Sequence, residues 1–326
     1  MKKKLEITKR LEKIVKPNKN IWLSSKLDAP VAILNLPAVY ACGKGCAGCI
    51  MDDGSIMLDE IETKLPIHVI LEQISYFARA HDTRFITING RGDPFHSLVK
   101  NETIEKIECA YANAMQAYVF TAGDSLNPEL SKFLADHTAN VMISLMGNDF
   151  IDSGFFEKKQ YDGRDAETAG NLRTLIRTYR ESDQQPQPDA TRVGMNYVVS
   201  EEDLISPNKL RELRKAANEN GIFFVSNLNF WPESDQDIRE KLREFAIENS
   251  DFGLSHSTAV NGVCQMGAGS SITIAANGDI YRCPYMLKGK HGNISNMTSG
   301  DVRDLILRYQ KDPRYACVVR KTKIER

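Results

Sequence analysis

The chain contains the stretch Ala41-Cys42-Gly43-Lys44-Gly45-Cys46-Ala47-Gly48-Cys49, which follows the apolar run Val31–Leu36. Three and then two residues separate the cysteines, so one loop supplies three thiols after a segment that reads as a β-strand. A cubane iron–sulfur cluster takes four ligands, usually thiolates. Three thiolates from one loop can hold three of its irons and leave the fourth iron open to a small molecule.

Two other kinds of site would use the same residues. Structural zinc prefers pairs of ligands that add up to four, and this loop contains no fourth cysteine or histidine. Cys46 and Cys49 alone would form a C-x-x-C redox pair, but that interpretation leaves Cys42 without a role. The spacing therefore favours a cluster over zinc or thiol chemistry.

Length and composition indicate a folded protein of one large domain and a smaller one. The chain has 326 residues, a hydrophobic content of 42% and a formal net charge of −1. With so little net charge, the electrostatic field of the whole protein does not favour binding to nucleic acid or to an anionic membrane. No apolar run in the sequence is long enough to span a bilayer. The segment 1–16 lacks the apolar core of a signal peptide. Seven cysteines without an export signal predict a cytoplasmic protein with reduced thiols.

Strand-like runs alternate with helical patterns along the first 250 residues. This order predicts the α/β class, with parallel βα units that form a partial (β/α)6 TIM-type barrel and carry functional loops at the carboxyl ends of the strands. The expected strands are Val31–Leu36, Phe85–Asn89, Ala117–Thr121, Asn140–Leu145, Val193–Val199 and Ile222–Asn229. The expected helices are Pro66–His81, Thr103–Gln116, Pro128–His137, Glu167–Glu181 and Pro207–Asn220.

The pattern changes near both ends of the chain. Lys3–Val15 has near-helical apolar spacing, so 1–30 is expected to be a helical extension and 31–250 the barrel. Two short strand-like runs flank Asn277-Gly278, which is a strong hairpin signal. A helical stretch near Asp301–Gln310 follows, so 251–326 is expected to form a small domain with a β-hairpin and a helix.

A second motif resembles a family signature. Asn89-Gly90-Arg91-Gly92-Asp93-Pro94 follows the second expected strand, where glycines let the backbone approach a ligand and a carboxylate can accept from an ammonium group. Together with the cysteine triad, it resembles the radical SAM superfamily and its Gly-Gly-Glu-Pro element, although Arg91 and Asp93 depart from that pattern. The resemblance implies that Cys42, Cys46 and Cys49 hold a [4Fe-4S] cluster, which cleaves S-adenosylmethionine (SAM) to a 5′-deoxyadenosyl radical.

The same resemblance implies further SAM contacts beside Gly90, Gly92 and Asp93. Ser144 ends the fourth expected strand, and Arg192 and Asn196 belong to the fifth. Phe120-Thr121-Ala122-Gly123 resembles a Thr-Asn-Gly turn of the family. Members usually carry an aromatic residue before the third cysteine, whereas this chain has Gly48, so Phe223 and Phe224 are the remaining candidates for packing on adenine.

Three cysteines of the C-terminal region predict a second metal site. Cys264, Cys283 and Cys317 surround the run Gly278-Asp-Ile-Tyr-Arg-Cys-Pro and the later Gly292-Asn293-Ile294. This arrangement resembles the hairpin of SPASM and twitch domains, which bind auxiliary iron–sulfur clusters, and three cysteines fit the shorter twitch form. His291 or His256 would complete the ligands, or one iron would stay open. A zinc site is the alternative. The seventh cysteine, Cys109, is expected to be a buried core thiol.

By the resemblance, the chain is a radical SAM enzyme that abstracts a hydrogen atom from its substrate. The expected substrate is a small polar metabolite such as a sugar or aminocyclitol, which the enzyme oxidises or epimerises. A peptide or protein substrate is the first alternative, and a non-catalytic iron–sulfur or zinc protein is the second. A reducing partner such as flavodoxin or ferredoxin is also implied.

Overall fold

The computed structural model describes a defined part of the 326-residue chain. The described residues are 31, 33–38, 41–42, 44, 46, 63–88, 92–145, 150–182, 192–228, 236–251, 259–260, 263–264, 271–282 and 290–311. The expected N-terminal helix Lys3–Val15 lies outside them. None of the described helices is both long and apolar enough to cross a membrane.

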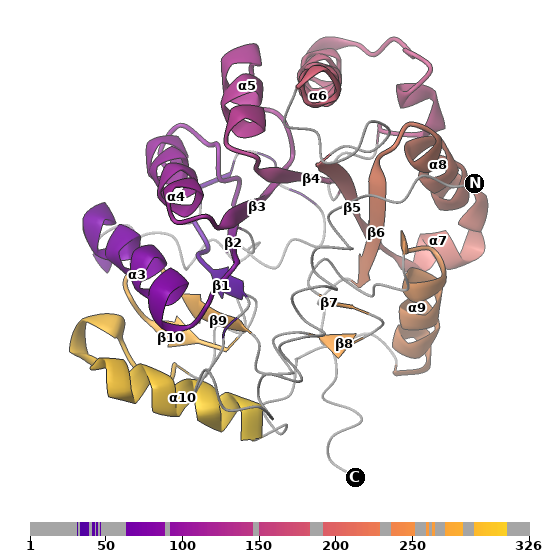
Figure 1. The fold of residues 1–326 in the computed structure, drawn as a ribbon. Helices are drawn as coiled ribbons and strands as arrows, with labels where there is room; N and C mark the ends of the chain where they lie inside the picture. The colour runs from indigo at the N-terminus through magenta and orange to yellow at the C-terminus, as the bar shows by residue number, and fades with distance from the viewer. Residues whose placement is uncertain are drawn as a thin grey trace. The chain divides into compact units, whose positions relative to one another are not determined.

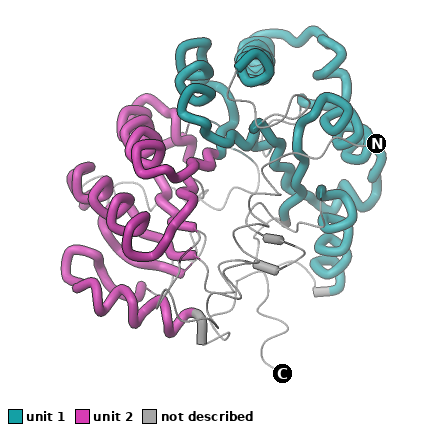
Figure 2. Tube along the Cα trace, viewed as in Figure 1, with its two compact units in different colours: residues 1–10, 44–49, 120–263 teal, residues 11–43, 50–119, 264–326 magenta. Residues whose placement is uncertain are grey.

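The chain divides into two compact units, which Figure 2 shows in teal and magenta. Unit 1 comprises Met1–Arg10, Lys44–Cys49 and Phe120–Val263. Unit 2 comprises Leu11–Gly43, Ile50–Val119 and Cys264–Arg326.

Unit 2 contains strands in the order β10-β9-β1-β2-β3. β1 pairs in parallel with both β2 and β9, β2 pairs in parallel with β3, and β9 and β10 are antiparallel. The strands are β1 (Ile33–Asn35), β2 (Phe85–Ile88), β3 (Gln116–Thr121), β9 (Ser271–Ile274) and β10 (Ile280–Tyr281). The helices are α3 (Ile67–Ala80), α4 (Lys100–Ala112), the short 3-10 helix η3 (Ile294–Asn296) and α10 (Ser299–Lys311).

The sequence of α3 shows why a helix forms and which face it buries. Ile70, Ile74 and Phe77 recur every three or four residues, so they lie on one face of the helix, and all three are buried. The neighbouring strands are buried along their whole length, which parallel strands covered by helices require. Figure 1 shows α3 and α4 on the same side of β1 and β2.

The hairpin of β9 and β10 continues the sheet at β1. Its turn needs Gly278, which has a φ of +82° and whose added Cβ would lie 2.6 Å from Cδ1 of Leu65. Beyond β10 the chain returns alongside it: the Ile280 amide donates to the Gly292 carbonyl, and the His291 amide donates to the Ile280 carbonyl (both 2.9 Å). The predicted hairpin and the helix after it are therefore present.

Unit 1 contains three parallel strands in the order β4-β5-β6 and a separate two-stranded sheet. The strands are β4 (Asn140–Ser144), β5 (Val193–Val199), β6 (Phe223–Leu228), β7 (Ala259–Val260) and β8 (Val263–Cys264), of which Cys264 is counted in unit 2. The helices are α5 (Pro128–Asp136), the 3-10 helix η1 (Ser153–Phe155), α6 (Gly163–Glu181), α7 (Glu201–Ile205), α8 (Pro207–Glu219) and α9 (Gln236–Glu248).

The predicted fold class is confirmed. Six parallel strands, β1 to β6, alternate with helices as in a partial TIM-type barrel. The expected strand Val193–Val199 coincides with β5, and the other barrel strands differ from their expected bounds by a few residues. The sequence analysis did not predict α7 and α9. The domain boundaries drawn from the sequence stay a prediction.

The free edge of β6 is closed by the residues that follow α9. The Phe224 amide donates to Oδ2 of Asp251 at 2.9 Å, and the Ser226 amide donates to Oγ of Ser250 at 2.7 Å. Burial raises the pKa of the Asp251 carboxyl, although the Phe224 amide and the Arg214 guanidinium, 3.1 Å away, oppose that shift. Asp251 therefore acts as a buried acceptor for both the strand and α8.

We expect Asp251→Ala to lower the free energy of unfolding by about 1–3 kcal/mol, because the buried Phe224 amide loses its acceptor. Urea unfolding followed by circular dichroism measures this change. Glu244→Ala, on the exposed face of α9, is the matched control and should change the value by less than about 0.5 kcal/mol. Equal stability of the two variants would contradict the role given to Asp251.

Candidate functional site

The carboxyl ends of β1 and β2 lie side by side because the two strands are parallel and paired in register. The chain that leaves β1 reaches Ala41 and Cys42 within a few residues. Cys42 and Cys46 are half-buried. Cys49 lies outside the described residues, and within the described part of the chain no three His, Cys, Asp or Glu side chains gather as a metal site.

Gly92, in the turn after β2, approaches the backbone of Ala41 more closely than any other residue type allows. Its φ is +59°, and an added Cβ would lie 2.6 Å from the Ala41 nitrogen and 2.7 Å from the Ala41 oxygen. The next residue completes the contact, since the Asp93 amide donates to the Ala41 carbonyl at 2.9 Å. The turn after β2 therefore fixes the residue that precedes Cys42.

Asp93 is buried and serves the same turn with its side chain. Its Oδ1 accepts from the Phe95 amide at 2.9 Å, and its carbonyl accepts from the His96 amide at 3.1 Å. These bonds keep the carboxylate near the start of the cysteine loop. Gly90, the other glycine predicted from this motif, lies outside the described residues.

A layer of buried polar side chains crosses the sheet of unit 2 just before the strands end. Asn35 pairs in register with Thr87 on β2 and with Thr273 on β9. Thr87 donates to the Asn35 side-chain oxygen, and Asn35 donates to the Ile272 carbonyl at 3.1 Å. Inward-facing positions of parallel barrel strands are usually apolar. The layer of Asn35, Thr87 and Thr273 therefore makes the core polar near the carboxyl ends of these strands.

The turn after β3 contains a charged residue that the sequence analysis did not single out. Gly123, with a φ of +94°, donates its amide to Oγ1 of Thr121 at 3.1 Å and so sets the turn. The following residue, Asp124, forms an ion pair with Lys44 of the cysteine loop, with 3.0 Å between Oδ1 and Nζ. A lysine among the cysteines and an aspartate after a strand end were visible in the sequence, but nothing in it linked them.

Asp124 stays ionised for a physical reason. Burial by itself raises the pKa of its carboxyl, but hydrogen bonds from Thr168 and Lys44 and the charges of Lys44 and Arg164 outweigh burial. The net pKa therefore lies below its ordinary value, and the carboxylate is charged across the neutral range.

In unit 1, two of the predicted SAM contacts come together and a third does not. Ser144 at the end of β4 pairs in register with Asn196 on β5, so the two side chains share a face. Asn227 of β6, which the sequence analysis missed, donates to the Asn196 side-chain oxygen. Arg192 lies four residues before Asn196, about 13 Å away along the strand at 3.3 Å per residue, towards the opposite end.

The two phenylalanines considered for adenine packing lie in the core of unit 1. Phe223 and Phe224 are buried, and the ring of Phe224 stacks on Tyr197 with 6.2 Å between centroids. Both rings are thus used in packing. An adenine platform is not apparent from either residue.

The C-terminal cysteines are described only through their surroundings. Cys264 ends β8, while Cys283, Cys317 and the alternative ligand His256 lie outside the described residues. Arg282, directly before Cys283, donates to the Tyr309 carbonyl in the last turn of α10 at 2.8 Å and lies over the Tyr309 ring. This bond ties the start of the Cys283 segment to the end of the helix that leads to Cys317.

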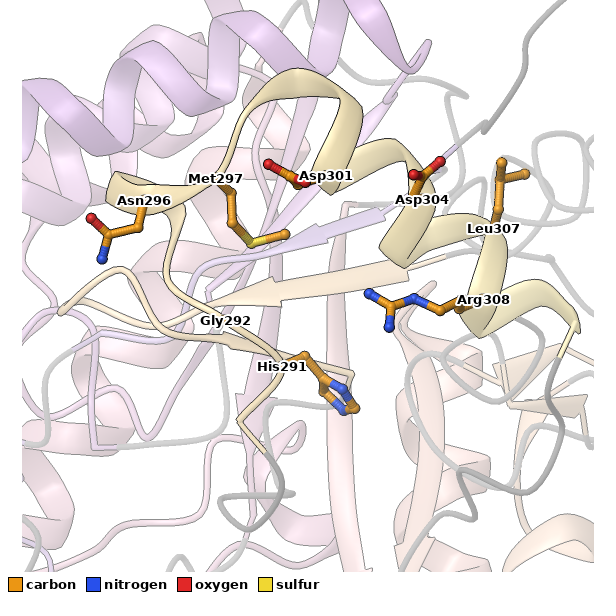
Figure 3. A pocket seen from close by; sticks show the side chains of 8 residues that line it. All are labelled: His291, Gly292, Asn296, Met297, Asp301, Asp304, Leu307 and Arg308. Carbon is orange, nitrogen blue, oxygen red and sulfur yellow. The ribbon is translucent and has the colours of Figure 1, made fainter.

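His291 also packs on the Tyr309 ring, with 5.1 Å between centroids. Burial and the charges of Arg282 and Arg308 lower the pKa of the His291 imidazole. An open groove of about 660 Å³ lies beside it, into which Met297 and Arg308 extend (Figure 3). Asp301 and Asp304 of α10 also line this groove. The Asp301 carboxylate accepts a hydrogen bond from the Thr298 amide, directly before α10.

No protein-family model matches the chain, and no curated protein matches it. Solved structures do match. SuiB of Streptococcus suis bound to S-adenosylmethionine is 14% identical, with 92% of this chain and 68% of that chain covered and a TM-score of 0.55. Native anSMEcpe with bound AdoMet and Kp18Cys peptide is 16% identical, with 87% and 84% covered and a TM-score of 0.55.

The chain has the fold of these S-adenosylmethionine-bound structures. A third match, SuiB bound to its precursor peptide SuiA, is 13% identical over 92% of this chain and 69% of that chain, with a TM-score of 0.56. At these identities the likeness establishes the fold. In this chain the Cys42 segment follows β1 and the Gly92 turn follows β2, as the sequence analysis expected.

We expect Gly92→Ala to lower the free energy of unfolding by about 2–4 kcal/mol, because the new Cβ adds a backbone clash to left-handed strain. Gly163→Ala is the matched control, since Gly163 has a φ of +54° with nothing within 4 Å of an added Cβ. Strain alone should cost the control about 1 kcal/mol. Chemical unfolding measures the free energy of unfolding of both variants. Equal decreases would show that the clash with the Ala41 backbone does not destabilise Gly92→Ala.

Proposed function

We propose that the chain is a radical SAM enzyme, in which Cys42, Cys46 and Cys49 hold a [4Fe-4S] cluster and SAM binds beside it. The observation that carries the proposal is the Cys42 segment, held by the Gly92 turn at the carboxyl end of β1 in a chain of this fold. The solved SuiB and anSMEcpe structures with bound S-adenosylmethionine support the same cofactor here.

The residues present fit such a cluster. Cys42 and Cys46 are half-buried cysteines of one short loop, so their sulfur atoms are partly exposed to solvent. Gly92 lets the turn after β2 lie against the backbone of Ala41, directly before Cys42, where any side chain would clash. Thiolates are the usual ligands of iron–sulfur clusters.

Each part of the site has a task that its chemistry supports. When bound, the cluster would supply the electron that cleaves SAM. The turn with Gly92 and Asp93 offers a carboxylate and backbone groups to the ammonium group of SAM. Ser144, Asn196 and Asn227 form a polar group on one face of unit 1 that can bind hydroxyl or carboxylate groups of the ligand. Arg192, at the other end of β5, stays outside this group and is the weakest of the predicted contacts.

For the substrate, we favour a peptide or protein side chain over the small polar metabolite expected from the sequence. Several of the similar structures carry peptides, among them SuiA in SuiB and Kp18Cys in anSMEcpe. The reaction type, oxidation or epimerisation, and a flavodoxin or ferredoxin as the electron donor remain parts of the same proposal.

The C-terminal cysteines Cys264, Cys283 and Cys317 would hold an auxiliary [4Fe-4S] cluster. The Arg282 bond to the end of α10 supports this assignment, because it fixes the segment that enters Cys283 near the helix that leads to Cys317. His291 packs against the same Tyr309 ring and is the better of the two histidine candidates for a fourth ligand.

We expect the triple variant Cys42→Ala, Cys46→Ala and Cys49→Ala to lose release of 5′-deoxyadenosine from SAM under dithionite. The matched control is Cys109→Ala, because Cys109 lies on α4 and donates to the Leu71 carbonyl at 3.5 Å, outside any loop. Chromatographic detection of 5′-deoxyadenosine is the measurement. A triple variant that still cleaves SAM would refute the proposal, and a wild-type protein that binds iron without cleaving SAM would indicate a non-catalytic binding protein.

Iron analysis tests the auxiliary cluster. We expect about eight irons per wild-type chain, from two cubanes of four. The variant with alanine at Cys264, Cys283 and Cys317 should retain about four and should unfold more readily in its C-terminal region, because metal binding adds folding free energy. About four irons with one zinc in the wild type would instead identify a zinc module and favour redox-neutral chemistry.

A further inference from the structure

Lys44 lies between Cys42 and Cys46, and its side chain is not a solvated surface group. The side chain is only 8% exposed, and its Nζ lies 3.0 Å from Oδ1 of Asp124. Lysine is rarely buried to this degree unless it is paired. The cysteine loop therefore contains one charged anchor, whose partner lies in the turn after β3.

Asp124 is itself held by a different part of unit 1. Its Oδ1 also accepts from Oγ1 of Thr168 at 2.7 Å, and its Oδ2 accepts from Arg164 at 2.8 Å, both from α6. Asn171 of the same helix donates to the carbonyl groups of Gly123 and Asp124. The carboxylate that pairs with Lys44 is thus also held in place by side chains of α6.

The pair constrains the loop because the alternatives are unfavourable. A buried lysine without a partner carries a large desolvation cost, so the loop conformations that separate Lys44 from Asp124 are disfavoured unless Lys44 moves into water. Ordering a segment before its ligand binds reduces the entropy cost of binding. Three thiolates brought close together also repel one another, which a nearby cation offsets.

We propose that Lys44 and Asp124 form a strap that fixes the cysteine loop before metal binds. Lys44 is a positioning residue, since it acts on the thiols of Cys42 and Cys46 through the loop backbone. That the loop binds an iron–sulfur cluster rests on the proposed function. The interaction of Lys44 with Asp124 does not depend on it.

Hydrogen–deuterium exchange of the metal-free, full-length chain tests the strap directly. Lys44→Met and Asp124→Asn should each speed amide exchange in the peptide 41–49 about tenfold, which corresponds to about 1.4 kcal/mol. The double variant should exchange no faster than either single variant, because both changes break one interaction. The β5 peptide 193–199 serves as the internal reference and should exchange as in the wild type.

Arg164→Met is the matched control. Arg164 also pairs with Asp124, but it comes from α6 and is 61% exposed, so its loss should leave exchange of the peptide 41–49 within about twofold. Unchanged exchange in Lys44→Met, additive effects in the double variant, or an Arg164→Met effect as large as that of Lys44→Met would each overturn the strap.

A second measurement separates the strap from the proposed function. After reconstitution with iron and sulfide, a chelator should remove iron from Lys44→Met about tenfold faster than from the wild type or from Arg164→Met. Wild-type protein that assembles no cluster at all would defeat the proposed function, and the exchange experiment would still decide whether Lys44 orders its loop.

Discussion

The start of the cysteine loop depends on one backbone approach, that of Gly92 to Ala41. Two turns that leave neighbouring parallel strands meet there without any side chain between them, and the Asp93 amide closes the contact. The approach is possible because the ladder of β1 and β2 continues past the strands, where the Leu36 amide donates to the Thr87 carbonyl at 2.8 Å. The position of Cys42 thus follows from strand register and a missing Cβ.

Each unit carries polar side chains towards the carboxyl ends of its strands. Unit 2 has the layer of Asn35, Thr87 and Thr273, and unit 1 has Ser144, Asn196 and Asn227. On the opposite faces of β1, β2 and β4, side chains such as Leu34, Ile86 and Ile143 are apolar and buried, so they contribute to the stability of the core. The polar side chains lie at the carboxyl ends of the strands, where barrels of this type bind their ligands.

The parts of the fold that were predictable are those set by local sequence pattern. The apolar run Val193–Val199 gave β5, and Asn277-Gly278 gave the hairpin turn. The helix α9 was missed although Ile238, Leu242 and Phe245 recur at helical spacing. The Lys44–Asp124 pair was missed because some eighty residues separate its partners. The pairing of β9 with β1 is likewise non-local, since no pattern within the hairpin states which strand it joins.

The closed edge of β6 restricts how a peptide could be recognised. Many proteins bind an extended peptide by adding it as a further strand to an exposed sheet edge, and the same open edges invite aggregation. In unit 1 the outward-facing amides of Phe224 and Ser226 are already taken by Asp251 and Ser250. A further strand could therefore not pair with these two amides of β6, and a peptide ligand would need other groups of the protein for its recognition.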